Sequence, residues 1–478
     1  MVDIPATRRG ARAIAVQATG VRPAFPAFTI AWSLPWVIAC AGMMTALLAP
    51  AIWNGFPLIF PDTGGYFTAP MLYAIANGRS ALYGFFLDLG IPFAFWPCVV
   101  AQAAMMVWLF MIALRVNGLG GRPWLALGIV AMLSAVTSLP WFAGQLMPDI
   151  FFPAAVLSLY LLAFAHEQLS RAERWGGAAI IAFSIASHMA LAGLCVGIVI
   201  ALFILMRVAR RITLPALPKL RLKFAAASVA AGIALCPISN LVLTGSFAFT
   251  PGGTTFLFGR LIEDGIIARY LEDQCPDSTI RLCAYQSKLP ALADDWLWGN
   301  SPLYELGGWE GYEPEEKRII NATLLRYPLV HITSAVKATL AQFASFATEI
   351  SLDDNEPTFN SFREFIPQFL PALMSARQQA ERFDVAPLNW LYVPVAGFAV
   401  AGLVLALAFR RRLRVAPQPA ALCLIILLAL AGNAAICGVF SHPVDRYQSR
   451  LVLLAPFAVA ILLARRWSAA QPRVNPPS

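Results

Sequence analysis

Long apolar runs, separated by short polar segments, dominate the chain. Runs of about 20 apolar residues are long enough to cross the hydrocarbon core of a bilayer, and lipid cannot satisfy free backbone groups, so each run must be helical. The pattern therefore predicts an all-α membrane protein with about ten spans. We expect the spans at residues 28–50, 91–114, 124–139, 150–165, 176–206 (two short helices meeting near Ser187 and His188), 224–243, 389–409, 420–440 and 451–464.

One long segment breaks this pattern. Residues 245–388 are rich in Asp, Glu, Gly, Pro and Trp, which predicts a mainly helical insertion outside the membrane, between spans seven and eight. Within it, residues 327–347 are moderately apolar and predict an interfacial helix, and Cys275 and Cys283 are expected to form a disulfide. The predicted organisation is a seven-span module at 1–244 with a polar first loop at 51–90, the insertion at 245–388, a three-span module at 389–466 and a tail at 467–478.

Composition supports a membrane protein, and the distribution of charge predicts its orientation. The 478 residues are 59% hydrophobic and 13% charged, with a formal net charge of +9. The arginines sit in short clusters at alternate ends of the apolar runs, as the positive-inside rule requires, so they favour anionic lipid headgroups as partners over nucleic acid. Both termini are predicted to be cytoplasmic, in a bacterial inner (plasma) membrane. The clusters are Arg8, Arg9 and Arg12; Arg207, Arg210 and Arg211; and Arg410, Arg411, Arg412 and Arg414.

Charged residues outside these clusters are the candidates for chemistry, because a charge at a membrane is costly. Asp62 lies in the first loop with Tyr66 and Arg79, and Asp149 begins the fourth predicted span. Arg446 and Arg450 begin the last one, and His188 lies in the helical hairpin. The predicted topology puts all of these except His188 at the outer face. Carboxylates beside arginines suit group transfer from a phosphate-activated lipid, with a carboxylate as general base and guanidinium groups on the phosphate.

Each candidate also has a structural interpretation. Asp62 precedes a Gly-rich turn and fits a turn-forming role, and Asp149 fits the favourable interaction of an acid with a helix N-terminus. Arg446 and Arg450 fit interfacial anchors, and His188 fits a hydrogen-bonded packing residue. The sequence contains no His/Cys cluster with metal-ligand spacing and no nucleotide-binding or nucleophile-elbow motif.

The order of these short motifs along the chain resembles the GT-C superfamily of integral-membrane glycosyltransferases, in particular bacterial relatives of the protein mannosyltransferases and the aminoarabinose transferase. The resemblance covers nearly the whole chain as a succession of short patterns. They are Asp62 with Tyr66; Gly78-Arg79-Ser80-Ala81-Leu82-Tyr83; Met147-Pro148-Asp149; Pro237-Ile238-Ser239-Asn240 with Thr244-Gly245-Ser246; Tyr327-Pro328; and Arg446-Tyr447.

The resemblance implies transfer of a sugar from a polyprenyl-phosphate-linked donor to a lipid, glycan or protein acceptor at the periplasmic face. It implies catalytic roles for Asp62, as general base, and for Asp149, as its support. Substrate contacts are implied at Tyr66, Arg79, Tyr83, Asn240, Arg446, Tyr447 and Arg450. His188 is a further candidate for substrate binding, although it stands where the family usually has Arg or Lys. No cofactor is assigned: the first loop shows one acid where many relatives carry two, which disfavours a divalent metal.

Two other functions fit parts of the pattern. A transporter or flippase of a lipid-linked saccharide would use the same charges to line a pathway, and a non-catalytic subunit of an envelope-assembly complex would need none of them. Transporters commonly show two repeated halves. The two halves of this chain show no repeat, and the candidate charges gather at one predicted face, which favours the enzyme.

Overall fold

The computed structural model describes residues 33–209, 217–348, 356–380 and 384–470. Over these ranges all regular secondary structure is helical, and the only pairing of extended backbone is a single parallel bridge between Leu58 and Gln145. The predicted start of the first span (28–32), Arg8, Arg9, Arg12, Arg210 and Arg211, and the end of the C-terminal tail from residue 471 lie outside the described residues.

Seven helical segments in the described part of the chain are long and apolar enough to cross a membrane. They make this a multi-pass membrane protein. They comprise α1 (Leu34–Asn54), α4 (Trp96–Leu114) with the π-helical turn that extends it to Leu119, α9 (Met189–Ala209), α10 (Leu222–Thr244), α20 (Asn389–Ala408) with the short turn before it, α21 (Pro417–Phe440), and α22 (Asp445–Val452) with α23 (Leu454–Ala470).

Three further predicted spans form shorter helices. These are α5 (Pro123–Val136), α7 (Phe151–Phe164) and α8 (Arg171–Ser187), of 14, 14 and 17 residues. A helix of 14 residues is about 21 Å long, less than the hydrocarbon core of about 30 Å. All residues of α7 are buried, so it is a central packing helix surrounded by others. The total of ten spans therefore stays a prediction.

The predicted division of residues 176–206 into two helices is confirmed, whereas their two membrane crossings stay a prediction. Helix α8 ends at Ser187, His188 has extended backbone, and α9 begins at Met189. The start of α8 is a capping box in which the Ser170 hydroxyl accepts from the Glu173 amide and the Glu173 carboxylate accepts from the Ser170 amide. Both helices also contact α10, the seventh predicted span.

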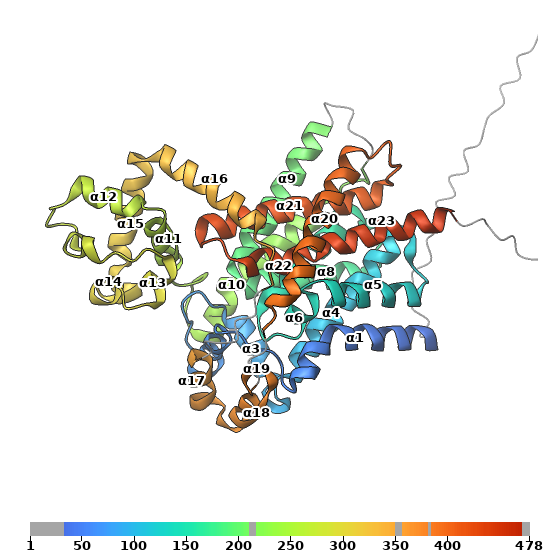
Figure 1. Ribbon diagram of the computed structural model, residues 1–478, viewed down its shortest axis with the longest axis horizontal. Coiled ribbons are helices and arrows are strands. Elements are labelled where there is room, and N and C mark those ends of the chain that lie inside the picture. Colours follow the sequence, from blue (N-terminus) through green and yellow to red (C-terminus); the bar gives the residue numbers. More distant parts are fainter. Residues whose placement is uncertain (1–32, 210–216, 349–355, 381–383, 471–478) are drawn as a thin grey trace, which may run out of the picture.

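The first part of the insertion is a helical unit with its own hydrophobic core around Phe258, Trp296 and Tyr312. A disulfide joins Cys275 to Cys283, as expected. Helix α16 (Pro328–Ala344) then leads from this unit to α21 (Figure 1). The unit contains α11 (Gly253–Glu263), α12 (Ile266–Gln274), α13 (Ala293–Trp298), α14 (Pro302–Glu305) and α15 (Gly308–Arg326).

The second part of the insertion packs elsewhere. Helices α17 (Glu356–Phe365), α18 (Leu370–Ser375) and α19 (Arg377–Ala380) lie beside the first loop and the end of α1 (Figure 1). The ring of Phe362 is fully buried between the rings of Phe56, Phe67 and Phe95. This part of the insertion therefore belongs to the main core, and its contacts shape the first loop.

Candidate functional site

Hydrogen bonds join the first loop to the segment that precedes α7. The Leu58 amide donates to the Gly144 carbonyl (2.9 Å), and the Leu146 amide donates to the Leu58 carbonyl (2.8 Å). The Thr63 hydroxyl donates to the Leu146 carbonyl at 3.2 Å. These bonds place Asp62, directly before the short helix Thr63–Phe67, close to the turn Pro148–Ile150 that carries Asp149.

Two side chains from the insertion hold the other edge of the loop. The Thr358 hydroxyl of α17 lies 3.1 and 2.8 Å from the carbonyls of Phe60 and Pro61 and accepts from the Gly64 amide at 2.9 Å. The Gln378 amide group of α19 bonds both the N–H and the carbonyl of Ile59, at 3.0 and 2.8 Å. The backbone on both sides of Asp62 is therefore fixed by residues about 300 positions away.

The first loop, the turn Pro148–Ile150 and α22 bring five charged side chains into one chain of contacts. Arg450 and Arg446 are four residues apart on α22, so they lie on one face of that helix. Arg450 Nη1 donates to Asp149 Oδ1 at 2.9 Å, and Arg446 Nε lies 3.4 Å from the same oxygen. Arg446 Nη1 is 3.6 Å from Asp62 Oδ2, and Arg79 Nη2 donates to Asp62 Oδ1 at 2.5 Å. The order is Arg450, Asp149, Arg446, Asp62, Arg79, and we call it the charged cluster.

Burial divides the charged cluster into an inner and an outer part. Asp149 and Arg450 are fully buried, whereas the Asp62 side chain is 32% exposed. Asp149 Oδ2 is buried and accepts no hydrogen bond from any described residue. Three guanidinium groups against two carboxylates leave one positive charge in excess. The outer end of the cluster is therefore the part that an anionic ligand can reach.

Aromatic rings replace water around the buried guanidinium groups. Arg446 lies over the ring of Phe60, with 3.9 Å from Cζ to the ring centroid, and Arg450 lies over Phe152 at 3.4 Å. The ring of Tyr447 is 4.9 Å from Arg450. Such cation–π contacts contribute up to about 2 kcal/mol each when desolvated. They help to offset the cost of keeping two arginines inside the protein.

Tyr66 and Tyr83 are buried beneath the first loop, where their rings contact each other. Their rings meet edge to face with centroids 4.8 Å apart, and both side chains are buried. The Tyr83 hydroxyl, on α3 (Ala81–Asp88), donates to Gln102 at 3.1 Å. Burial raises the pKa of Tyr66, whose ring also lies 5.7 Å from the Arg79 guanidinium. The geometry gives Tyr83 a packing role and places Tyr66 behind the charged cluster.

The other predicted site residues lie at different distances from the cluster. The His188 ring meets Phe152 edge to face at 5.0 Å, so it shares that ring with Arg450, and its Nδ1 accepts from the Ala190 amide. The Asn240 side chain instead donates to the carbonyls of Ala248 and Phe249, at 2.8 and 3.1 Å. Asn240 therefore stabilises the turn after α10, and among the described residues its side chain makes no hydrogen bond to the cluster.

Sequence reasoning did not identify a histidine–aspartate pair beside the cluster. His442 Nε2 lies 3.5 Å from Asp294 Oδ2, which joins the extramembrane unit to the segment between α21 and α22. Partial burial raises the pKa of Asp294; His442 opposes this shift, while the carboxylates of Glu263 and Asp62 add to it. His442 lies four residues before Arg446, and this spacing could have identified it as a residue near the site. Nothing in the sequence connects Asp294 to His442.

The absence of a side chain at Gly65 leaves space for the Arg79 side chain. A β-carbon at Gly65 would lie 3.3 Å from the Arg79 Nε, a distance tighter than ordinary packing. The Gly64-Gly65 pair, which the sequence suggested as a turn, thus also lets the guanidinium approach Asp62. A larger residue at position 65 would push Arg79 away from that carboxylate.

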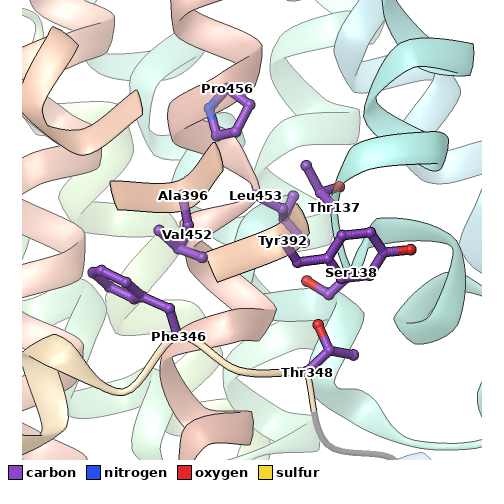
Figure 2. A pocket seen from close by; sticks show the side chains of 9 residues that line it. All are labelled: Thr137, Ser138, Phe346, Thr348, Tyr392, Ala396, Val452, Leu453 and Pro456. Atoms are coloured by element: carbon purple, nitrogen blue, oxygen red, sulfur yellow. The ribbon is translucent and has the colours of Figure 1, made fainter. Parts of the chain in front are cut away.

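A small cavity lies behind α22 and is too small for a substrate. Figure 2 shows the hydroxyl-bearing side chains of Thr137, Ser138, Thr348 and Tyr392 among its walls, with Val452 beside them. Its volume is about 10 Å³, close to the minimum that accommodates one water molecule. This cavity is therefore a hydration site at most.

No family model, curated protein or solved structure matches this chain. Among the described residues, no three His, Cys, Asp or Glu side chains come together in a way that could hold a metal ion.

Proposed function

We propose that this protein is a GT-C-like membrane glycosyltransferase that moves a sugar from a polyprenyl-phosphate-linked donor to a lipid, glycan or protein acceptor. The observation that carries the proposal is the charged cluster, in which the partly exposed Asp62 lies between Arg79 and Arg446. A carboxylate that a ligand can reach, next to guanidinium groups, suits proton transfer coupled to departure of a phosphate.

In the proposed reaction an acceptor hydroxyl attacks the anomeric carbon of the sugar. The new bond joins that carbon to the acceptor oxygen, and the bond from the same carbon to the lipid-phosphate oxygen breaks with its electron pair. The hydroxyl proton passes to Asp62, and the configuration at the anomeric carbon inverts. The lipid phosphate leaves with one additional negative charge, next to the positive excess of the cluster.

The roles follow from burial. Arg79 is 16% exposed and sits at the outer end of the cluster, so a donor phosphate can compete with Asp62 for its guanidinium. That exchange would free Asp62 Oδ1 to accept the acceptor's proton. Asp149 is fully buried and contacts both α22 arginines, so it orients Arg446 and does not itself meet the substrate.

The test is transfer of labelled sugar from a polyprenyl-phosphate donor by the purified protein in liposomes. Asp62→Asn keeps the shape of the side chain and removes the base, so we expect a fall in rate of about 10²–10⁴-fold. The matched control is Glu356→Gln, which neutralises an exposed carboxylate paired to Arg363 at 2.6 Å. Near wild-type transfer by Asp62→Asn would refute the assignment, and sugar-lipid translocation without transfer would favour a transporter.

The proposal includes a topology of ten spans, with both termini in the cytoplasm of a bacterium and the charged cluster at the periplasmic face of its inner membrane. Reporters at Gly308, on the extramembrane unit, and at Arg412, after α20, test it. We expect them on opposite sides of the membrane. Finding both on one side would exclude the ten-span arrangement.

A further inference from the structure

An apolar groove of about 330 Å³ lies where the extramembrane unit meets the membrane helices. Its walls come from four helices that are distant in sequence. Helix α11 contributes Leu257, α15 contributes Leu324, α16 contributes Ile332 and Ala335, and α21 ends in the groove with Phe440. The groove is much larger than the roughly 10–15 Å³ that one water molecule needs, so it can accept a segment of a chain molecule.

The two polar residues in the groove carry no free charge for a polar ligand. The Asp264 carboxylate accepts from Arg260 at 2.5 Å. Burial lowers the pKa of His331, an effect that the Asp264 charge partly opposes, so the imidazole is neutral at pH 7. The one buried polar atom of the lining without a partner is His331 Nε2, so a phosphate or sugar placed here would lose most of its hydrogen bonds to water without replacement. The lining therefore selects hydrocarbon.

The groove opens onto an apolar surface that continues along α16. Leu329, Ile332, Val336 and Leu340 are spaced by three or four residues, so they share one face of the helix, and each is 54–77% exposed. Ile332 also lines the groove. A hydrocarbon chain lying against this face can therefore enter the groove without crossing a polar surface.

The opposite face of α16 lies against the end of a membrane helix. The Ala338 carbonyl is so close to Gly438 of α21 that a β-carbon at position 438 would be 2.7 Å from it. Helix α21 is apolar enough to span the membrane and ends at Phe440, which is 58% exposed. The exposed face of α16 thus lies beside the end of a helix that is able to span the membrane, which puts the mouth of the groove where that helix would leave one leaflet of the bilayer.

We infer that this groove binds one hydrocarbon chain of a membrane phospholipid. Phospholipid is the bulk component of the leaflet to which the groove opens, and the described residues that line the groove include no lysine or arginine to recruit a particular phosphate. The chain fills the space between α11, α15 and α21, and it thereby ties the extramembrane unit to the membrane. This site is separate from the charged cluster and does not depend on sugar transfer.

The experiment uses the full-length protein in nanodiscs containing phosphatidylethanolamine with a diazirine in one acyl chain. After illumination, mass spectrometry maps the adducts. We expect adducts on the groove-facing residues Leu257 and Leu324. Ala335→Trp fills the groove and should lower labelling of α11 about tenfold, the factor that 1.4 kcal/mol of lost binding produces.

The matched control is Ala341→Trp, on an exposed position of the same helix that does not line the groove, and it should leave labelling of α11 unchanged. If Ala335→Trp does not fold, Leu324→Asp places a charge at the groove and should lower labelling in the same way. Absence of α11 adducts in the wild type, or their persistence in the folded groove variants, would overturn the proposal. Preferential labelling by a diazirine polyprenyl phosphate at equal concentration would also overturn it.

Discussion

The ion pair between Asp149 and Arg450 supports the sharpest prediction, because its energetics can be measured without knowing the reaction. Both side chains are essentially inaccessible to solvent (1% and 0% exposed), with 2.9 Å between Arg450 Nη1 and Asp149 Oδ1. Arg450→Met leaves the buried carboxylate with one partner, Arg446 Nε at 3.4 Å. Removing one member of a buried pair costs about 3–5 kcal/mol, and the remaining arginine places this case near the lower end.

Replacing both members tests whether the cost comes from an uncompensated charge. The double variant Asp149→Asn/Arg450→Met removes one negative and one positive charge, and Arg446 keeps its contact with Asp62 at 3.6 Å. We therefore expect the double variant to lose less stability than the sum of the two single variants. The coupling energy should be about 2 kcal/mol, within the range for residues in one network.

The assay is a double-mutant cycle from reversible unfolding in mixed micelles, with the exposed pair Glu356–Arg363 as the reference cycle. That pair is close, at 2.6 Å, but its side chains are 59% and 48% exposed, so its coupling should stay below about 1 kcal/mol. Equal coupling at the two pairs, or additive losses at Asp149 and Arg450, would refute the view that the buried pair holds α22 against the turn Pro148–Ile150 before α7.

Three further changes test the first loop and the extramembrane unit. Thr358→Val removes the hydroxyl that lies between two carbonyls of the first loop. It should lower the free energy of unfolding by about 1–3 kcal/mol and speed hydrogen exchange of the amides of the first loop. Unchanged exchange would count against this contact. Serine at both Cys275 and Cys283 opens a short closed loop and should destabilise the extramembrane unit by roughly 2–3 kcal/mol, measured by thermal unfolding; an unaltered transition would contradict this. Burial raises the pKa of Glu316 to about 7, so folding favours the protonated form of this carboxyl group. The free energy of unfolding should therefore fall as pH rises from about 4.5 through 7, by about 3 kcal/mol in all. Glu316→Gln should abolish that dependence, and a variant with the same pH profile as the wild type would refute the prediction.

Several structural features could be predicted from local sequence alone. The helical break at His188 follows from an apolar run flanked by basic residues on both sides, and α8 and α9 meet there. The Cys275–Cys283 disulfide follows from two nearby cysteines in a segment outside the membrane. The prediction that the last span starts at Leu451 was less accurate, since the helical segment begins at Asp445. The reason is that polar residues of α22 are buried inside the protein.

The candidate site was only partly predictable. Topology grouped Asp62, Asp149 and Arg446 at one face, and the structure brings all three into contact. It separates Asn240, whose amide is occupied by its own turn. Asp294 was missed, because its approach to His442 depends on how the extramembrane unit docks.

The sequence by itself determined that this is a helical, multi-pass membrane protein with a polar insertion, because span length and apolar composition are local properties that each segment carries independently. Only the tertiary structure decided which faces of those helices meet. A face that contacts lipid and one that contacts another helix are equally apolar, so sequence patterns do not distinguish them. For the same reason, only the packing of distant segments decided that Thr358 bonds the backbone next to Asp62 and that the five charged side chains follow one another in this order.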